Sequence, residues 1–264
     1  MGGRDFFVFS KPWKDVSVST LGGIVKRMGF DGVEFPLRDG YQVEPAGAEK
    51  GLPKLAGELG QCGVKICTVA SETTERVFAG CQAAGVPIIR VMFMNYGMPK
   101  QYLQAESDWK REIEGFLPLC VKYGVKVSVQ QHCGPGVNNS MEMLHLLEGY
   151  DAKLVGGVWD AAHSGLAGEE PEQALDIIWS HLHLANFKNA CYIRANGPEA
   201  PAKYRIHMTT GENGLCSWER AVAHLKKRGY AGNVCMPAEY SDDANVEAYA
   251  ARDLAYLKGL FENA

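Results

Sequence analysis

Four polar residues in the second half of the chain lie at the ends of short apolar runs, where their side chains could bind a divalent metal ion. They offer two carboxylates, one imidazole and one amide oxygen, a set that suits Mn²⁺, Mg²⁺ or Co²⁺ better than a metal that prefers thiolates. An ion held there would polarise a carbonyl group and stabilise the negative charge that develops on its oxygen. The four residues are Gln130, Asp160, His183 and Glu239.

The segments that must position these residues repeat along the chain. Short, nearly continuous apolar runs are typical of strands buried on both faces. They alternate with segments of helical spacing that stop at glycine, the usual residue after a last helical turn. This alternation predicts an α/β protein, a (β/α)8 TIM barrel whose single domain covers residues 1–264. The eight runs are 6–10, 30–35, 63–70, 85–93, 124–131, 152–160, 181–187 and 232–240.

An open doubly wound sheet is the competing architecture. It would carry a glycine-rich phosphate-binding turn after its first strand, and the segment FSKPW at that place contains no glycine. The barrel is therefore preferred, and its active site is expected where the carboxyl ends of the strands meet. The longest interruption, residues 188–217, is expected to be a functional or mobile loop.

Several of these segments resemble the xylose isomerase-like sugar isomerase/epimerase superfamily. The motifs VSVQQH, VGGVWDAAH and HLHLANFK, and the segment from TGENGL to PAEY, are similar to its second half, and MGFDGVEF is similar to its second strand. The resemblance implies a metal-dependent barrel that acts on sugars or related polyols, with the four residues named above as ligands. It also implies that His163, in the motif Asp-x-x-His, binds substrate oxygens, and it matches His132 to the histidine of the family's Glu-Asn-His motif.

The chain departs from the family pattern at Gln130, where the family has a glutamate that is both ligand and acid/base. An amide oxygen can still bind a metal, but the amide has no proton to exchange at neutral pH. The loss of one negative charge predicts weaker metal binding. A second departure follows His183: the family often continues with Lys-Asp, whereas this chain reads Leu-Ala-Asn-Phe-Lys, ending at Lys188.

These features predict a metal-dependent isomerase or epimerase that moves a proton next to a sugar carbonyl through a metal-stabilised enediolate. Glu239 is the expected general base, and His132 or His163 would move the second proton. The expected cofactor is one divalent ion, Mn²⁺ first, with Mg²⁺, Co²⁺ or Zn²⁺ as alternatives. A site with one carboxylate base equally supports a lyase acting by β-elimination on a keto-sugar, inosose or 3-oxo-glycoside. A degenerate sugar-binding subunit is a third interpretation.

Each predicted ligand also has a simpler structural interpretation. Asp160 and Glu239 could form salt bridges or cap a loop, and His183, between two leucines, could be a core histidine with local hydrogen bonds. Gln130 could hydrogen-bond a neighbouring side chain instead of a metal. Other polar residues near strand ends are expected to bind substrate at the rim of the pocket: Lys11, Trp13, Glu34, His163, Lys188 and His207.

Net charge, the length of apolar runs and the spacing of cysteines limit which kinds of partner the protein is expected to have. The chain has 27 Lys and Arg against 31 Asp and Glu, a net charge of −4, which argues against a nucleic-acid-binding protein such as an endonuclease-IV-type relative. No apolar run approaches the roughly 18–20 residues of a membrane span, and the eight cysteines form no Cys-x-x-Cys pair. We therefore expect a cytoplasmic protein with a small sugar or polyol substrate and no membrane or nucleic-acid partner. A homo-oligomer is left open.

Overall fold

Eight parallel strands close into a barrel in the computed structural model of the chain, which describes residues 4–96 and 100–263. The strands are hydrogen-bonded in the order β1-β10-β7-β6-β5-β4-β3-β2. This architecture confirms the predicted (β/α)8 TIM barrel. The barrel strands are β1 (Phe6–Phe9), β2 (Gly32–Pro36), β3 (Lys65–Ala70), β4 (Ile88–Val91), β5 (Lys126–Gln130), β6 (Val155–Asp160), β7 (Leu182–Asn186) and β10 (Asn233–Met236).

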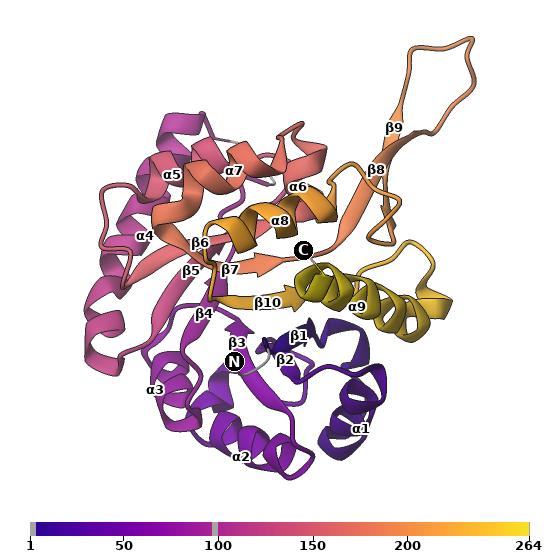
Figure 1. The fold of residues 1–264 in the computed structure, drawn as a ribbon. Helices are drawn as coiled ribbons and strands as arrows, with labels where there is room; N and C mark the ends of the chain where they lie inside the picture. The colour runs from indigo at the N-terminus through magenta and orange to yellow at the C-terminus, as the bar shows by residue number, and fades with distance from the viewer. Residues whose placement is uncertain (1–3, 97–99, 264) are drawn as a thin grey trace.

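Helices connect the strands and cover the outside of the barrel (Figure 1). The predicted glycine stops are seen at their ends: Gly29, with φ of 92°, follows the first helix and donates its backbone N–H to carbonyl groups of the last turn. The helices are α1 (Val18–Met28), α2 (Ala48–Gln61), α3 (Glu75–Ala84), α4 (Tyr102–Tyr123), α5 (Ser140–Leu147), α6 (Ala161–Leu166), α7 (Pro171–Ile178), α8 (Trp218–Lys227) and α9 (Val246–Asn263). No helix among the residues described has the length and apolar character that a membrane crossing requires.

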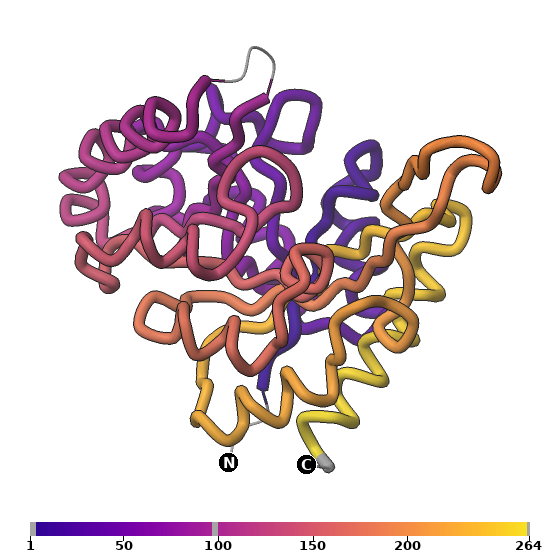
Figure 2. The backbone as a smooth tube through the Cα atoms, turned by 90° about the horizontal axis from the view of Figure 1, so that it is seen from above, coloured from indigo at the N-terminus to yellow at the C-terminus, as the bar shows by residue number. Residues whose placement is uncertain are grey.

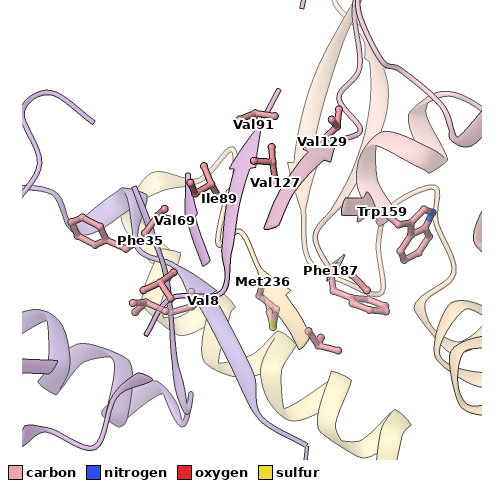
Figure 3. Packing of buried hydrophobic residues seen from close by; sticks show 14 of the residues in the cluster. Val8, Phe35, Val69, Ile89, Val91, Val127, Val129, Trp159, Phe187 and Met236 are labelled. Carbon is pink, nitrogen blue, oxygen red and sulfur yellow. The ribbon is translucent and has the colours of Figure 1, made fainter. Parts of the chain in front are cut away.

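Apolar side chains fill both faces of the barrel strands. Between strands and helices, Phe187 meets Trp159 and Trp218 edge to face, with ring centroids 5.8 and 5.4 Å apart, and Figure 3 shows Trp159 and Phe187 with other members of this layer. A smaller apolar cluster fills the inside of the barrel, so groups that could act on a ligand gather at the carboxyl ends of the strands. This inner cluster consists of Phe7, Phe9, Cys67, Ala70, Val158, Leu184 and Cys235.

The segment after β7 forms a hairpin rather than the loop that was expected over residues 188–217. Strands β8 (Asn189–Arg194) and β9 (Tyr204–Thr209) pair antiparallel as a separate two-stranded sheet. Figure 1 shows the hairpin projecting from the barrel, and Figure 2 shows it on the side opposite the start of β1 and the end of α9. At its base, the buried Asn189 Nδ2 donates to the carbonyl groups of Gly211 and Cys216 at 2.7 and 2.8 Å. These bonds fix the hairpin to the barrel where β7 ends.

The lower half of the barrel holds His183 through hydrogen bonds to both ring nitrogens. Its Nδ1 accepts from the Ser128 hydroxyl at 2.8 Å, and its Nε2 donates to the Ala152 carbonyl at 2.6 Å. The absence of a side chain at Gly156 makes room for the ring, because a Cβ there would lie 2.5 Å from His183 Nε2. Burial lowers the pKa of His183 to about 4. The neutral ring is therefore the form that the folded protein accommodates.

This histidine should make the folded state sensitive to acid. Its pKa is about 4 when folded and about 6.5 when unfolded, so protons bind the unfolded chain preferentially and its stabilising effect, present above pH 6.5, is lost as the pH falls toward 4. The loss should be on the order of 1–3 kcal/mol. Urea unfolding at pH 7, 5.5 and 4.5 measures it.

The matched variant is His183→Gln, in which the stability should fall less between pH 7 and 4.5 than in the wild type. His145→Gln, at a histidine whose side chain is 54% exposed, is the control and should keep the wild-type pH dependence. Equal pH slopes for wild type and His183→Gln would contradict this account.

Candidate active site

A chain of hydrogen-bonded polar side chains crosses the carboxyl ends of β2, β4, β5 and β6. Arg90 of β4 donates to the carboxylate of Glu34 on β2 and to the amide oxygen of Gln130 on β5. Gln130 Nε2 in turn donates to Asp160 Oδ2 on β6 at 2.8 Å. All four side chains are buried. Each of the three charges therefore depends on its neighbours in the chain, because water does not reach it.

The hydrogen-bonding partners fix the orientation of the Gln130 amide. Arg90 can only donate and the Asp160 carboxylate can only accept, so the amide oxygen faces the former and the amide nitrogen the latter. The opposite orientation would set donor against donor and acceptor against acceptor. A carboxylate at position 130 could accept from Arg90 but could not donate to Asp160. Gln130 thus joins a cation to an anion, in agreement with the simpler structural interpretation of this residue.

Lys188, two residues after β7, places a buried ammonium group between two carboxylates. Its Nζ lies 2.7 Å from Glu239 Oε2 and 3.7 Å from Asp160 Oδ2. Burial acts to lower the pKa of Lys188, but Asp160 and Glu239 outweigh it and raise the pKa above its ordinary value. Lys188 is therefore a permanent cation at neutral pH.

The Glu239 carboxylate, just after β10, is held by two ammonium groups. Besides Lys188, it contacts Lys11 Nζ, which lies 2.9 Å from Oε1. Burial acts to raise the pKa of Glu239, but the two lysines outweigh it and hold the pKa far below its ordinary value. A carboxylate held in this way is a weak base. The proton-accepting role predicted for Glu239 from the sequence therefore has little support in its surroundings.

Asn186, the last residue of β7, lies at the strand end where a metal-binding histidine was predicted. It pairs in register with Asp160 of β6 and Cys235 of β10. Its side chain is 1% exposed, and neither its Oδ1 nor its Nδ2 has a hydrogen-bond partner within the described ranges. An unpaired buried amide costs about 1–3 kcal/mol. Because Asn186 also lines a cavity, we expect a ligand to supply the missing partners.

Two adjoining cavities open onto these residues. The inner one, of about 80 Å³, is lined by Lys11, Gln130, Asn186, Lys188 and Glu239 among others. The outer one, of about 750 Å³, shares Lys11, His132 and Glu239 with it and lies within the usual range of small-molecule sites. A ligand in the outer cavity can therefore extend a polar group toward Lys188 and Asn186.

His132 and His163 lie against each other beside these cavities, with ring centroids 4.1 Å apart and ring planes tilted by 39°. His132 Nδ1 contacts the Cys133 carbonyl at 2.8 Å, and since a carbonyl can only accept, this nitrogen carries a proton, which makes Nε2 the basic nitrogen of the neutral ring. His163 Nδ1 accepts from the Cys133 backbone N–H at 3.2 Å, and its Nε2 has no partner among the residues described. Burial lowers the pKa of His163 to about 3, so its ring is neutral.

The predicted set of four metal ligands is not assembled. His183 is the second residue of β7 and lies in the lower half of the barrel, whereas Asn186, the last residue of that strand, is level with Asp160. The structure thus does not bring His183 together with the other three predicted ligands, and its contacts are those of the alternative, a locally hydrogen-bonded histidine. The Gln130 oxygen is bonded to Arg90, and both Glu239 oxygens face ammonium groups. These four residues do not fit a divalent ion.

A different group of side chains has the spacing of metal ligands. His132, Cys133 and His163 each offer one ligand atom within 4.8 Å of the other two. Burial raises the pKa of the Cys133 thiol, which disfavours the thiolate that a metal would bind. The group is thus a candidate metal site, and its nitrogen and sulfur ligands would suit Zn²⁺ better than Mn²⁺.

Three predicted substrate contacts lie away from the cavities. Trp13 packs into the core between barrel and helices, while its neighbours Lys11, Pro12 and Lys14 line the outer cavity. His207 lies in β9 of the hairpin, paired with Cys191. Glu34 is fully buried against Arg90 and acts as a structural acceptor. The predicted residues that the structure does bring together are Lys11, Gln130, His132, Asp160, His163, Lys188 and Glu239.

Arg90 is the member of the site that the sequence analysis missed. It is a single charged residue inside the apolar run of β4, between Ile89 and Val91, and an isolated charge in a buried strand was the available signal. Its guanidinium also lies 4.8 Å from the ring centroid of Phe9 inside the barrel. Its partners Glu34 and Gln130 are distant in sequence, so the pairing depends on closure of the barrel.

Comparison with known proteins identifies the architecture. A family model described as xylose isomerase-like TIM barrel matches residues 23–260. The chain is 26% identical over 163 residues to an inosose dehydratase of Bacillus licheniformis, an alignment that covers 58% of this chain and 54% of that protein. The chain thus spans about half the length of the curated relatives it matches.

Solved structures extend the likeness to nearly the whole chain. D-psicose 3-epimerase from Clostridium cellulolyticum H10, in a structure with D-tagatose, has a TM-score of 0.75 at 12% identity and covers 97% of this chain and 99% of its own. The probable 3-DHS dehydratase involved in petrobactin synthesis from Bacillus anthracis has a TM-score of 0.74 at 13% identity, covering 97% of this chain and 98% of its own. At these identities the likeness concerns the fold.

The pairing of Arg90 with Glu34 can be tested by stability measurements. Arg90→Met leaves the fully buried Glu34 carboxylate without its partner and should lower the free energy of unfolding by about 3–5 kcal/mol. Urea unfolding at pH 7 measures the change. The double variant Arg90→Met, Glu34→Met removes both charges and should recover a large part of the loss. Additive losses in the double variant would show that the two side chains do not depend on each other.

Proposed function

The chain belongs to the xylose isomerase-like TIM barrel family, and from this premise we propose that it is a dehydratase acting on a sugar-like keto-polyol. The enzyme would remove a proton from the carbon next to a carbonyl group and then expel a neighbouring hydroxyl as water. The observation that carries the proposal is the lining of one cavity. It contains His132, whose Nε2 can act as a base, together with the ammonium groups of Lys11 and Lys188.

The proposed base is His132 rather than Glu239. The His132 ring lines both cavities, and the hydrogen bond from Nδ1 to the Cys133 carbonyl leaves Nε2 able to accept a proton. The neutral His163 ring lies against it and would keep it in place. Glu239, held between two lysines, would position their ammonium groups.

The elimination balances with the groups present. His132 Nε2 takes the proton, the C–H electron pair becomes the double bond of an enolate, and negative charge develops on the carbonyl oxygen near the Lys188 and Asn186 side chains. When the enolate re-forms the carbonyl group, a carbon–carbon double bond forms and the C–O bond of the neighbouring hydroxyl breaks. Lys11, whose side chain is 48% exposed at the rim, would donate the proton with which the hydroxyl leaves as water.

An epimerase, the reaction class first expected from the sequence, needs a second base on the opposite face of the substrate. Besides His132, the inner cavity is lined by cationic and amide side chains, which do not accept a proton readily at neutral pH, and by one carboxylate, Glu239, whose pKa two lysines hold far below its ordinary value. Inosose dehydratases among the relatives in sequence also support the dehydratase. An inosose or a related cyclic keto-polyol is thus the proposed substrate class.

Activity should depend on His132. With an inosose as substrate, wild-type protein should form a conjugated enone with loss of one water, followed by ultraviolet absorbance and mass spectrometry. His132→Gln removes the base and should lower kcat by about 10²–10⁴-fold. His145→Gln, a histidine whose side chain is 54% exposed on α5, is the control and should leave kcat unchanged.

Deuterium oxide distinguishes the two reactions. A dehydratase with one base should give an unsaturated product and no epimer of the starting compound. Formation of an epimer that carries deuterium next to the carbonyl, with no loss of water, would establish the epimerase instead. Full activity of His132→Gln would remove His132 from the role of base.

A further inference from the structure

We propose that the Lys188 ammonium group takes the place of a divalent cation in this barrel, so that the site operates without a metal ion. The inference rests on the proposed function for the reaction it serves, but its central claim concerns the charges of the site and can be tested without turnover. The chemical class that Lys188 would bind is an oxygen that gains negative charge, such as the carbonyl oxygen of a keto-polyol.

The carboxylate oxygens that would bind a metal are already engaged. Asp160 Oδ1 accepts the backbone N–H of His163 at 3.2 Å, and Oδ2 accepts from Gln130 at 2.8 Å with Lys188 at 3.7 Å. Glu239 places one oxygen against Lys188 and the other against Lys11. A divalent ion would have to displace the buried Lys188 ammonium group to reach both carboxylates.

The site holds no excess of negative charge for a metal to neutralise. Four cations, Lys11, Arg38, Arg90 and Lys188, line the inner cavity, and three carboxylates, Glu34, Asp160 and Glu239, accompany them. Gln130 adds no charge and connects Arg90 to Asp160. Two further positive charges at this place would be repelled by buried cations in a low-dielectric environment, where such repulsion is strong.

Lys188 retains a hydrogen-bonding capacity for a ligand. An ammonium group has three N–H donors, and the carboxylates of Asp160 and Glu239 account for at most two of them. Lys188 and Asn186 line the same inner cavity, and the Asn186 amide has no partner in the part of the chain that the structure describes. The remaining ammonium N–H and the Asn186 amide N–H could therefore donate to one substrate oxygen.

Metal binding by the purified protein tests the inference directly. After dialysis against a chelator, the wild type should retain no stoichiometric Mn²⁺ or Zn²⁺ by elemental analysis, and calorimetric titration with Mn²⁺ should detect no site. Lys188→Met removes the ammonium group and frees Asp160 and Glu239, so one Mn²⁺ site should become detectable, at least tenfold tighter than the weakest affinity that the wild-type titration can register. Lys203→Met, at an exposed position of the hairpin, is the control and should match the wild type.

The wild-type titration keeps the test valid if Lys188→Met fails to fold. One tightly bound Mn²⁺ per wild-type chain would overturn the inference, as would one Zn²⁺ that is lost when His132 or Cys133 is replaced. Where inosose turnover is detected, activity unchanged by chelator supports the inference, and activity lost to chelator and restored by Mn²⁺ contradicts it. Absence of turnover with unchanged metal results would count against the proposed function alone.

Discussion

The ion pair of Lys188 with Glu239, beside Asp160, is the interaction on which the rest of the site depends. A closed barrel removes water from the ends of its strands, so every charge placed there needs a partner of opposite sign. Asp160 contacts the Gln130 amide nitrogen and the Lys188 ammonium group. The Gln130 amide oxygen accepts from Arg90, and the Glu34 carboxylate neutralises Arg90. The identity of each side chain thus limits the next from β6 through β5 and β4 to β2.

Lower in the barrel, the cost of burying a charge is avoided by a neutral side chain rather than by an ion pair. There the interior is apolar around Val158 and Leu184, and the polar group that is present, His183, is accommodated as a neutral ring with both nitrogens bonded. The upper end accepts ions because each buried carboxylate there contacts a cation. The lower end favours an uncharged histidine because burial lowers the pKa of His183, and Lys126 and His181 lower it further.

Alternation of apolar and helical segments was enough to predict the barrel and to place Gln130 and Asp160 at the ends of adjacent strands. The height of His183 in the barrel could not be predicted, because an apolar run does not show which of its residues ends the strand level with Asp160. In the structure β7 ends at Asn186, three residues after His183. The role of Gln130 as a hydrogen-bonded link between Arg90 and Asp160 could not be predicted either. Its partner Arg90 is forty residues earlier in the chain, and only closure of the sheet brings the two together.

An ammonium group and a metal ion differ in what they can do for a substrate, and this difference bears on the reaction. A divalent ion can bind two neighbouring substrate oxygens at once, which suits proton transfer along a diol. Lys188 carries one charge and directs its N–H donors separately, two of them toward Asp160 and Glu239. It is therefore suited to stabilise a single oxygen, as the enolate of an elimination requires. The lysine that balances the buried carboxylates thus also favours loss of water over rearrangement of a diol.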